Sequence, residues 1–78
     1  MKLPRSVAAA QLIKALEKAD YEKVRQRGSH VRLYRPASPP HFITVPLHNP
    51  LKIGTLNSIL DEVSAHIGIA VEDLINLL

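Results

Sequence analysis

The sequence of 78 residues contains no cysteine, no tryptophan and only three glycines. Without cysteine the chain forms neither a disulfide framework nor a thiolate metal site. With so few glycines, it has no glycine-rich nucleotide-binding loop. No apolar run approaches the roughly 20 residues of a membrane-spanning helix, and residues 1–5 lack the long apolar segment of a signal peptide. We therefore expect a cytoplasmic protein without a membrane segment.

Aromatic residues are also scarce, at 4% of the chain, which is thin for a protein that stacks several bases in a row. Lysine and arginine number 10 against 7 acidic residues, so the formal net charge is +3. This mild excess favours an anionic partner, either a nucleic acid or an acidic protein. Because this length suffices for one small domain and no more, we expect residues 1–78 to form a single domain.

Residues 6–19 have the composition of a helix. Ser6 is the expected N-cap, and an alanine-rich run leads into a narrow apolar stripe that includes Leu12 and Leu16. We expect Asp20 near the C-terminal cap, because aspartate tolerates the left-handed backbone conformation.

Residues 21–27, 30–35 and 41–45 are predicted to form strands. The Gly28-Ser29 dipeptide is the expected turn between the first two strands. Three prolines in the loop 36–40 end the pairing before the third strand begins. Apolar and polar residues alternate in the second and third strands, so these two strands can form a hairpin with one buried face.

The clearest amphipathic pattern follows a proline-punctuated connection at residues 46–54. Thr55 is the expected cap of this second long helix, and Gly68 is expected to end it. Its apolar positions are Leu56, Ile59, Leu60, Val63 and Ile67. Residues 71–78 are expected to add a short last helix. The order α-β-β-β-α with an extra C-terminal helix predicts the α+β class, with helices on one face of a three-stranded antiparallel sheet.

The uncovered face of this sheet carries the residues of chemical interest. Strand alternation places Val31 and Leu33 towards the core. The opposite face then holds His30, Arg32, Tyr34, Phe42 and Thr44. An imidazole takes or gives a proton near neutral pH. His30 is therefore a candidate acid or base for RNA cleavage, in which the 2′-hydroxyl attacks the adjacent phosphate.

Basic and hydroxyl side chains supply candidate RNA contacts. Arg27 and Arg32 carry charge suited to a phosphorane-like transition state, and Ser29 has a hydroxyl that can donate to a phosphate oxygen. Lys52 lies just before a predicted helix N-terminus, where free N–H groups attract anions.

One histidine cannot be both acid and base in a single protonation state. The second proton carrier is left open among Tyr34, a lysine and water. The other histidines, at positions 41, 48 and 66, lack the convergent spacing of metal ligands. We therefore expect no metal site and no cofactor.

Four segments together resemble the HicA family, small mRNA interferase toxins of bacterial and archaeal toxin–antitoxin systems. They are Leu12–Lys18, Arg27-Gly28-Ser29-His30, Val45-Pro46 and Lys52–Leu60, in the order and spacing of the family's pattern. The Gly-Ser-His tripeptide is unspecific alone. Its combination with Gly-Thr-Leu-x-x-Ile-Leu, in a chain of this length, is specific.

The resemblance implies a double-stranded-RNA-binding-domain-like fold and metal-independent endoribonuclease activity on mRNA. It equates His30 with the family's catalytic histidine in Gly-Ser-His. It also implies inhibition by a HicB-type antitoxin, with operator DNA contacted through the antitoxin. The alternative is a module of the same fold that binds RNA or protein without cleavage.

Two positions depart from the family's pattern. Asp20 stands where a glycine is frequent after the first helix, and Ala70 stands where a serine or threonine often caps the last helix. The second departure predicts a last helix that frays without a partner. Neither departure touches Gly28-Ser29-His30.

Overall fold

The computed structural model describes residues 6–78, and its sheet has three antiparallel strands in the order β1-β2-β3. These are β1 (Glu22–Arg27), β2 (His30–Arg35) and β3 (His41–Pro46). The expected strands are therefore confirmed to within one residue at each end. Because consecutive strands are neighbours in the sheet, short connections suffice to join them.

The turn between β1 and β2 is the two-residue Gly28-Ser29 loop, and Gly28 has a φ of 56°. A glycine with positive φ at the first central position is typical of a type II′ hairpin turn. This turn places Arg27 directly opposite His30. It therefore fixes the register of every pair that follows along the hairpin.

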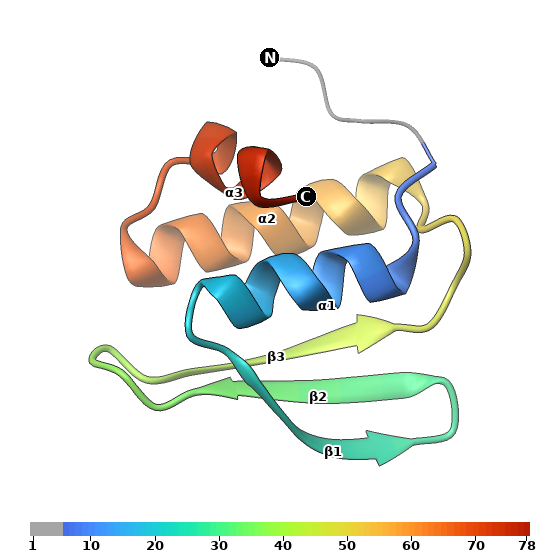
Figure 1. Ribbon diagram of the computed structural model, residues 1–78, viewed down its shortest axis with the longest axis horizontal. Helices are drawn as coiled ribbons and strands as arrows, with labels where there is room; N and C mark the ends of the chain where they lie inside the picture. The colour runs from blue at the N-terminus through green and yellow to red at the C-terminus, as the bar shows by residue number, and fades with distance from the viewer. Residues whose placement is uncertain (1–5) are drawn as a thin grey trace.

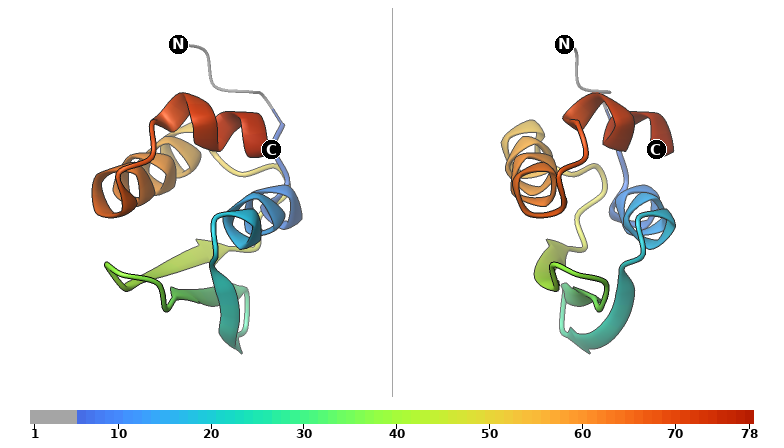
Figure 2. Two further views of the ribbon diagram at one scale, coloured as in Figure 1. Left: turned by 60° about the vertical axis from the view of Figure 1, so that its left-hand side comes forward. Right: turned by 90° about the vertical axis from the view of Figure 1, so that its left-hand side faces the viewer.

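Three helices lie on one side of the sheet and leave the other side uncovered (Figure 1). They are α1 (Ala9–Lys18), α2 (Ile53–Ile67) and α3 (Val71–Leu77). The short α3 crosses both longer helices on the side away from the sheet (Figure 2). The predicted α-β-β-β-α order, its extra C-terminal helix and the α+β class are thus confirmed. No helix within residues 6–78 has the length and apolar character needed to cross a bilayer.

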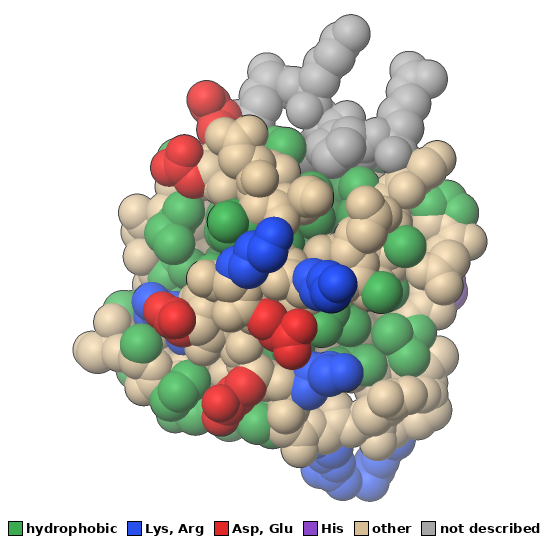
Figure 3. All heavy atoms as spheres, in the orientation of Figure 1, with side chains coloured by type: hydrophobic (Ala, Val, Ile, Leu, Met, Phe, Trp, Pro, Cys, Tyr) green, Lys and Arg blue, Asp and Glu red, His purple; other side chains and the backbone are tan. Residues whose placement is uncertain are grey.

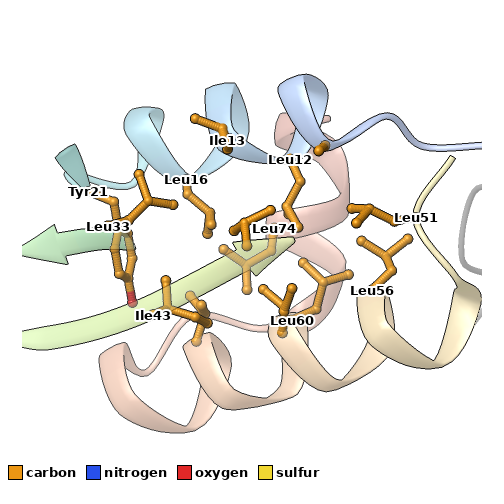
Figure 4. Packing of buried hydrophobic residues seen from close by; sticks show 14 of the residues in the cluster. Leu12, Ile13, Leu16, Tyr21, Leu33, Ile43, Leu51, Leu56, Leu60 and Leu74 are labelled. Carbon is orange, nitrogen blue, oxygen red and sulfur yellow. The ribbon is translucent and has the colours of Figure 1, made fainter. Parts of the chain in front are cut away.

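The core fills the space between the helices and the covered face of the sheet (Figure 4). The stripe predicted for α2 is buried through Leu56, Ile59, Leu60 and Val63, and α3 contributes Leu74. The sheet contributes the alternate positions of β2 and β3 that point towards the helices: Val31, Leu33, Ile43 and Val45. Strand alternation therefore separates a buried apolar face from an open polar one.

The start of α1 differs from the sequence prediction. The helix begins at Ala9 rather than near Ser6, which has a φ of 57° and lies outside it. Its first N–H groups find other acceptors: the Gln11 side chain accepts from Ala8 at 2.9 Å, and Asn49 Oδ1 accepts from Ala9 at 3.1 Å. A residue distant in sequence therefore supplies the cap predicted from Ser6.

The start of α2 also differs, because the helix begins at Ile53 with Lys52 as its N-cap. Thr55 lies within the first turn and is not the cap. Both predicted helix ends are confirmed, since Asp20 and Gly68 adopt left-handed backbone conformations with φ values of 74° and 72°. The expectation about a signal peptide concerns residues 1–5, which lie outside the described part of the chain.

Candidate functional site

The open face of the sheet carries polar side chains together with one aromatic pair, Tyr34 and Phe42. Each inward-pointing residue of β2 and β3 has neighbours that point outward, so His30, Arg32 and Phe42 are exposed while Tyr34 and Thr44 are partly exposed. The register pairs Arg32 with Thr44 and Tyr34 with Phe42 across β2 and β3. The five residues predicted for this face therefore do share it.

A shallow hollow of about 160 Å³ lies at the hairpin end of this face. It is lined by Arg25, Arg27, His30, Arg32 and Thr44. One group of lysine and arginine spheres lies at the strand edge of the molecule, away from the helices, while others are spread over the middle of the same view (Figure 3). Three guanidinium groups around one exposed imidazole form a site suited to an anion with several oxygen atoms.

Arg32 is held in position across the sheet. Its Nη1 donates to Thr44 Oγ1 at 3.2 Å, and its guanidinium carbon lies 4.8 Å from the centre of the Phe42 ring. The ring attracts the cation through its quadrupole. Arg32 therefore bridges β2 and β3 and also lines the hollow.

Arg25 belongs to the hollow although the sequence analysis did not select it. The two-residue turn places Arg27 opposite His30 and Arg25 opposite Arg32. That register was available from the Gly28-Ser29 turn, because paired residues of antiparallel strands point to the same face. A β-bulge between Lys23 and Arg25 then shifts the rest of β1 by one residue.

Ser29 lies in the turn immediately before His30 and is exposed. Its carbonyl oxygen accepts a hydrogen bond from the Leu47 N–H at 2.7 Å. This bond ties the hairpin turn to the chain that follows β3. It holds the backbone on the N-terminal side of His30 in place.

Lys52 does not join the hollow around His30. It lines a second depression together with Pro46, His48, Leu51 and Thr55. Pro46 lies opposite His30 across β2 and β3, so the two depressions adjoin the same pair from different sides. Lys52 therefore lies outside the hollow, in the neighbouring depression.

Tyr34 is separated from the hollow along the strand. It lies four residues from His30, which corresponds to roughly 13 Å in an extended chain. Its ring packs on Phe42, with ring centres 4.4 Å apart and planes inclined by 31°. No lysine is among the residues that line the hollow. The sequence left Tyr34, a lysine and water open as the second proton carrier. Of these three, water is the one that this geometry fits.

A second group of titratable residues lies on the helix side of the sheet, where His41 and Tyr21 are buried while Glu62 and His66 are exposed. His41 is 6% exposed and lies between Tyr21 and Glu62. The carboxylate of Glu62 accepts a hydrogen bond from His41 Nε2 at 2.9 Å, and the Tyr21 hydroxyl donates to His41 Nδ1. Burial raises the pKa of Tyr21 to about 12, with Arg35 acting to lower it and Glu62 to raise it.

His66 completes this group. Its ring stacks on that of His41 with centres 4.0 Å apart, and its Nδ1 donates to the Glu62 carbonyl oxygen at 3.2 Å. The cluster joins the start of β1 to β3 and α2. Within residues 6–78, no three histidine or carboxylate side chains converge as metal ligands. We therefore interpret the cluster of Tyr21, His41, Glu62 and His66 as a structural clamp.

Comparison with known proteins identified a matching family. A family model described as "HicA toxin of bacterial toxin-antitoxin" matches residues 9–64, from the first residue of α1 to near the end of α2. The matched segment contains the hollow and every residue that lines it. Searches among curated proteins and among solved structures returned no match.

Proposed function

The chain belongs to the HicA toxin family of bacterial toxin–antitoxin systems, and we propose that it is a metal-independent endoribonuclease that cleaves mRNA by means of His30. Growth inhibition by loss of translated mRNA is the biological consequence of this proposal. The family membership makes the chain the toxin of such a system.

The observation that carries the proposal is the placement of an exposed imidazole among three guanidinium groups. His30 and the arginines at positions 25, 27 and 32 line one hollow. A phosphodiester bound by these arginines would bring its ribose next to the imidazole. Proton transfer and charge stabilisation are the two contributions that cleavage of RNA by its own 2′-hydroxyl requires.

The proposed reaction has one displacement step. His30 removes the proton of the 2′-hydroxyl, and the oxygen attacks the adjacent phosphorus. The bond from phosphorus to the 5′-oxygen breaks, and water protonates the leaving oxygen. The products are a 2′,3′-cyclic phosphate and a 5′-hydroxyl end. The arginines neutralise the extra negative charge on the phosphate in the transition state, where preorganised donors contribute most.

Arg27, Arg32 and Ser29 are the proposed RNA contacts close to the reacting phosphate. Lys52 is the proposed contact for a phosphate farther along the strand, because it lines the neighbouring depression. These contacts involve the backbone of the RNA. They therefore contribute affinity without base specificity.

Membership of a toxin–antitoxin family implies an antitoxin partner. We propose that this partner is a HicB-type protein with an acidic surface that covers the basic hollow. A net charge of +3 favours rapid association with such a partner at low ionic strength. Contact with operator DNA is assigned to the antitoxin in this proposal.

The test uses a single-stranded RNA incubated with the purified chain, with and without a chelator. We expect cleavage that the chelator leaves unchanged, with cyclic phosphate ends. A substrate with a 2′-deoxyribose at the scissile position should remain intact. His30→Ala should lower the cleavage rate by roughly 10²–10⁴-fold. His66→Ala, which changes an exposed histidine on α2 outside both depressions, serves as the matched control.

Two outcomes would contradict the proposal. Equal cleavage rates for His30→Ala and the parent would show that His30 takes no part in catalysis. RNA that is bound but stays intact under all conditions would favour the non-cleaving RNA-binding module. The basic hollow also supports this alternative, because arginines bind phosphate whether or not the RNA is cleaved.

A further inference from the structure

A pair of aromatic rings lies on the open face next to the hollow. Tyr34 and Phe42 are opposite each other across β2 and β3, with ring centres 4.4 Å apart. Phe42 is 49% exposed. Its neighbours His41 and Ile43 point into the protein and are buried, so strand alternation keeps the Phe42 ring in solvent.

Arg32 connects this aromatic pair to the hollow. The same guanidinium that lines the hollow lies 4.8 Å from the centre of the Phe42 ring. A phosphate bound in the hollow is therefore one side chain away from an exposed aromatic ring. In a nucleic acid, each phosphate is bonded to a ribose, and that ribose carries a base.

Exposed rings beside a cationic site are the elements from which single-stranded nucleic acid surfaces are built. Most large apolar side chains of residues 6–78 are buried or partly buried. Of the exposed ones, Val24 and Ile53 lie on the β1 bulge and at the start of α2. Phe42 alone among these three is flat, and it lies against a residue of the hollow.

We propose that the Phe42 ring, supported by Tyr34 and Arg32, is a stacking site for one unpaired nucleobase next to the phosphate bound at Arg25, Arg27 and Arg32. This inference rests on the proposed function and adds a site for one base, which must be unpaired. A base within a duplex is stacked on both faces and cannot lie on the ring. One aromatic pair accommodates one base, in keeping with the scarcity of aromatic residues in the sequence.

The aromatic pair also stabilises the sheet, as cross-strand aromatic pairs generally do. Loss of stability in a Phe42 variant therefore carries no information about RNA. The test must instead report stacking itself. Fluorescence of 2-aminopurine provides that report, because stacking on an aromatic ring quenches it.

The experiment uses a short 2′-O-methyl oligonucleotide, which has no free 2′-hydroxyl and so remains intact, with 2-aminopurine placed at each position in turn. We expect the parent protein to quench one position. Phe42→Leu should lose this quenching and bind about 10-fold more weakly. Phe42→Tyr should retain both, and Ile53→Ala, an equally exposed apolar residue outside the sheet, should match the parent.

Binding without quenching at any position would overturn the stacking site, as would quenching that survives in a folded Phe42→Leu protein. Cleavage of ordinary RNA is measured in parallel. Cleavage without quenching would reject stacking and leave the nuclease proposal intact. Quenching that depends on Phe42, together with RNA that stays uncleaved, would support stacking and reject the nuclease proposal.

Discussion

Arg25 and Arg32 lie directly opposite each other in neighbouring strands, and both line the hollow that contains His30. Like charges at directly opposed positions destabilise a sheet by roughly 0.2–1 kcal/mol. Arg27, opposite His30, adds a third positive charge at the same end of the hairpin. Placing these charges together is costly for the free protein, and a bound anion would offset the repulsion.

The first prediction follows from this pair. Arg25→Thr removes one charge and introduces a good strand former, so the free energy of unfolding should rise by roughly 0.2–1 kcal/mol at low salt. Affinity for single-stranded RNA should fall, and the slope of log K against log salt should become shallower by about 0.7. Urea unfolding and RNA titration at several salt concentrations measure both effects. A variant that is less stable and binds RNA as well as the parent would contradict the assignment.

The second prediction contrasts two histidines that lie on opposite sides of the sheet. His30 is exposed, so His30→Ala should change stability by less than about 0.5 kcal/mol, while cleavage falls by roughly 10²–10⁴-fold. His41 is buried between Tyr21 and Glu62, so His41→Ala should cost about 2–4 kcal/mol. Cleavage per folded molecule should be unchanged in that variant. Thermal unfolding combined with single-turnover cleavage separates the two roles.

Much of the fold could be predicted because its signals are local. The alternation in β2 and β3 specified which face is buried, and the amphipathic repeat specified α2. The helix starts could not be predicted in this way, because the Ala9 N–H is capped by Asn49, which lies 40 residues away. Ser6 and Thr55 have the side chains of capping residues, but Asn49 caps the start of α1, and α2 starts after Lys52 with no side-chain cap.

The site was predictable to the extent that strand alternation determines it. His30 and Arg32 could be assigned to one face from their spacing, whereas Arg25 required the register set by the two-residue turn. The same alternation places His41 on the face of Ile43 and Val45, which is the signal for its burial. The position of Lys52 depends on the path of the 46–52 connection, for which the sequence has no periodic signal.

The third prediction concerns alkaline pH. Tyr21 has a pKa of about 12 in the folded protein against an ordinary value of 10.0, because burial disfavours its charged form. The folded state therefore binds this proton more tightly than the unfolded state. The protonated Tyr21 hydroxyl therefore contributes about 2–3 kcal/mol to the free energy of unfolding. This contribution is complete below pH 10 and is lost as the pH rises through 12. Lysine titration in the same range affects parent and variants alike.

Tyr21→Phe isolates this contribution. Loss of the hydroxyl leaves His41 Nδ1 without its partner, so the variant should be about 1–2 kcal/mol less stable near pH 7. The difference in free energy of unfolding between parent and variant should narrow between about pH 10 and 11.5, because only the parent has a hydroxyl at position 21 that ionises on unfolding. Urea unfolding of both proteins across that range measures it, with Tyr34→Phe as the control on the open face. A constant difference would show that Tyr21 does not titrate as the burial predicts.

The fourth prediction concerns the long-range cap of α1. Asn49 Oδ1 accepts the Ala9 N–H, and this bond joins the 46–52 connection to the first turn of α1. Asn49→Ala should therefore cost about 0.5–2 kcal/mol. Asn49→Asp keeps an acceptor and adds a negative charge at a helix N-terminus, so it should retain the parent's stability or exceed it. Chemical denaturation ranks the three proteins, and equal losses in both variants would exclude the capping role.

The fifth prediction concerns α3, which forms without a capping side chain at Ala70. Leu74 anchors this helix in the core, but the N–H of Asp73 has only the Ala70 carbonyl as acceptor, at 3.0 Å. A serine hydroxyl at position 70 would accept that N–H, and Asp73 lies at the position where an acidic side chain completes a capping box. Ala70→Ser should therefore raise stability by about 0.5–1 kcal/mol and slow hydrogen exchange throughout α3. Ala70→Val supplies no acceptor, so it should neither raise stability nor slow hydrogen exchange. Equal exchange rates in the two variants would show that the missing cap does not determine the stability of α3.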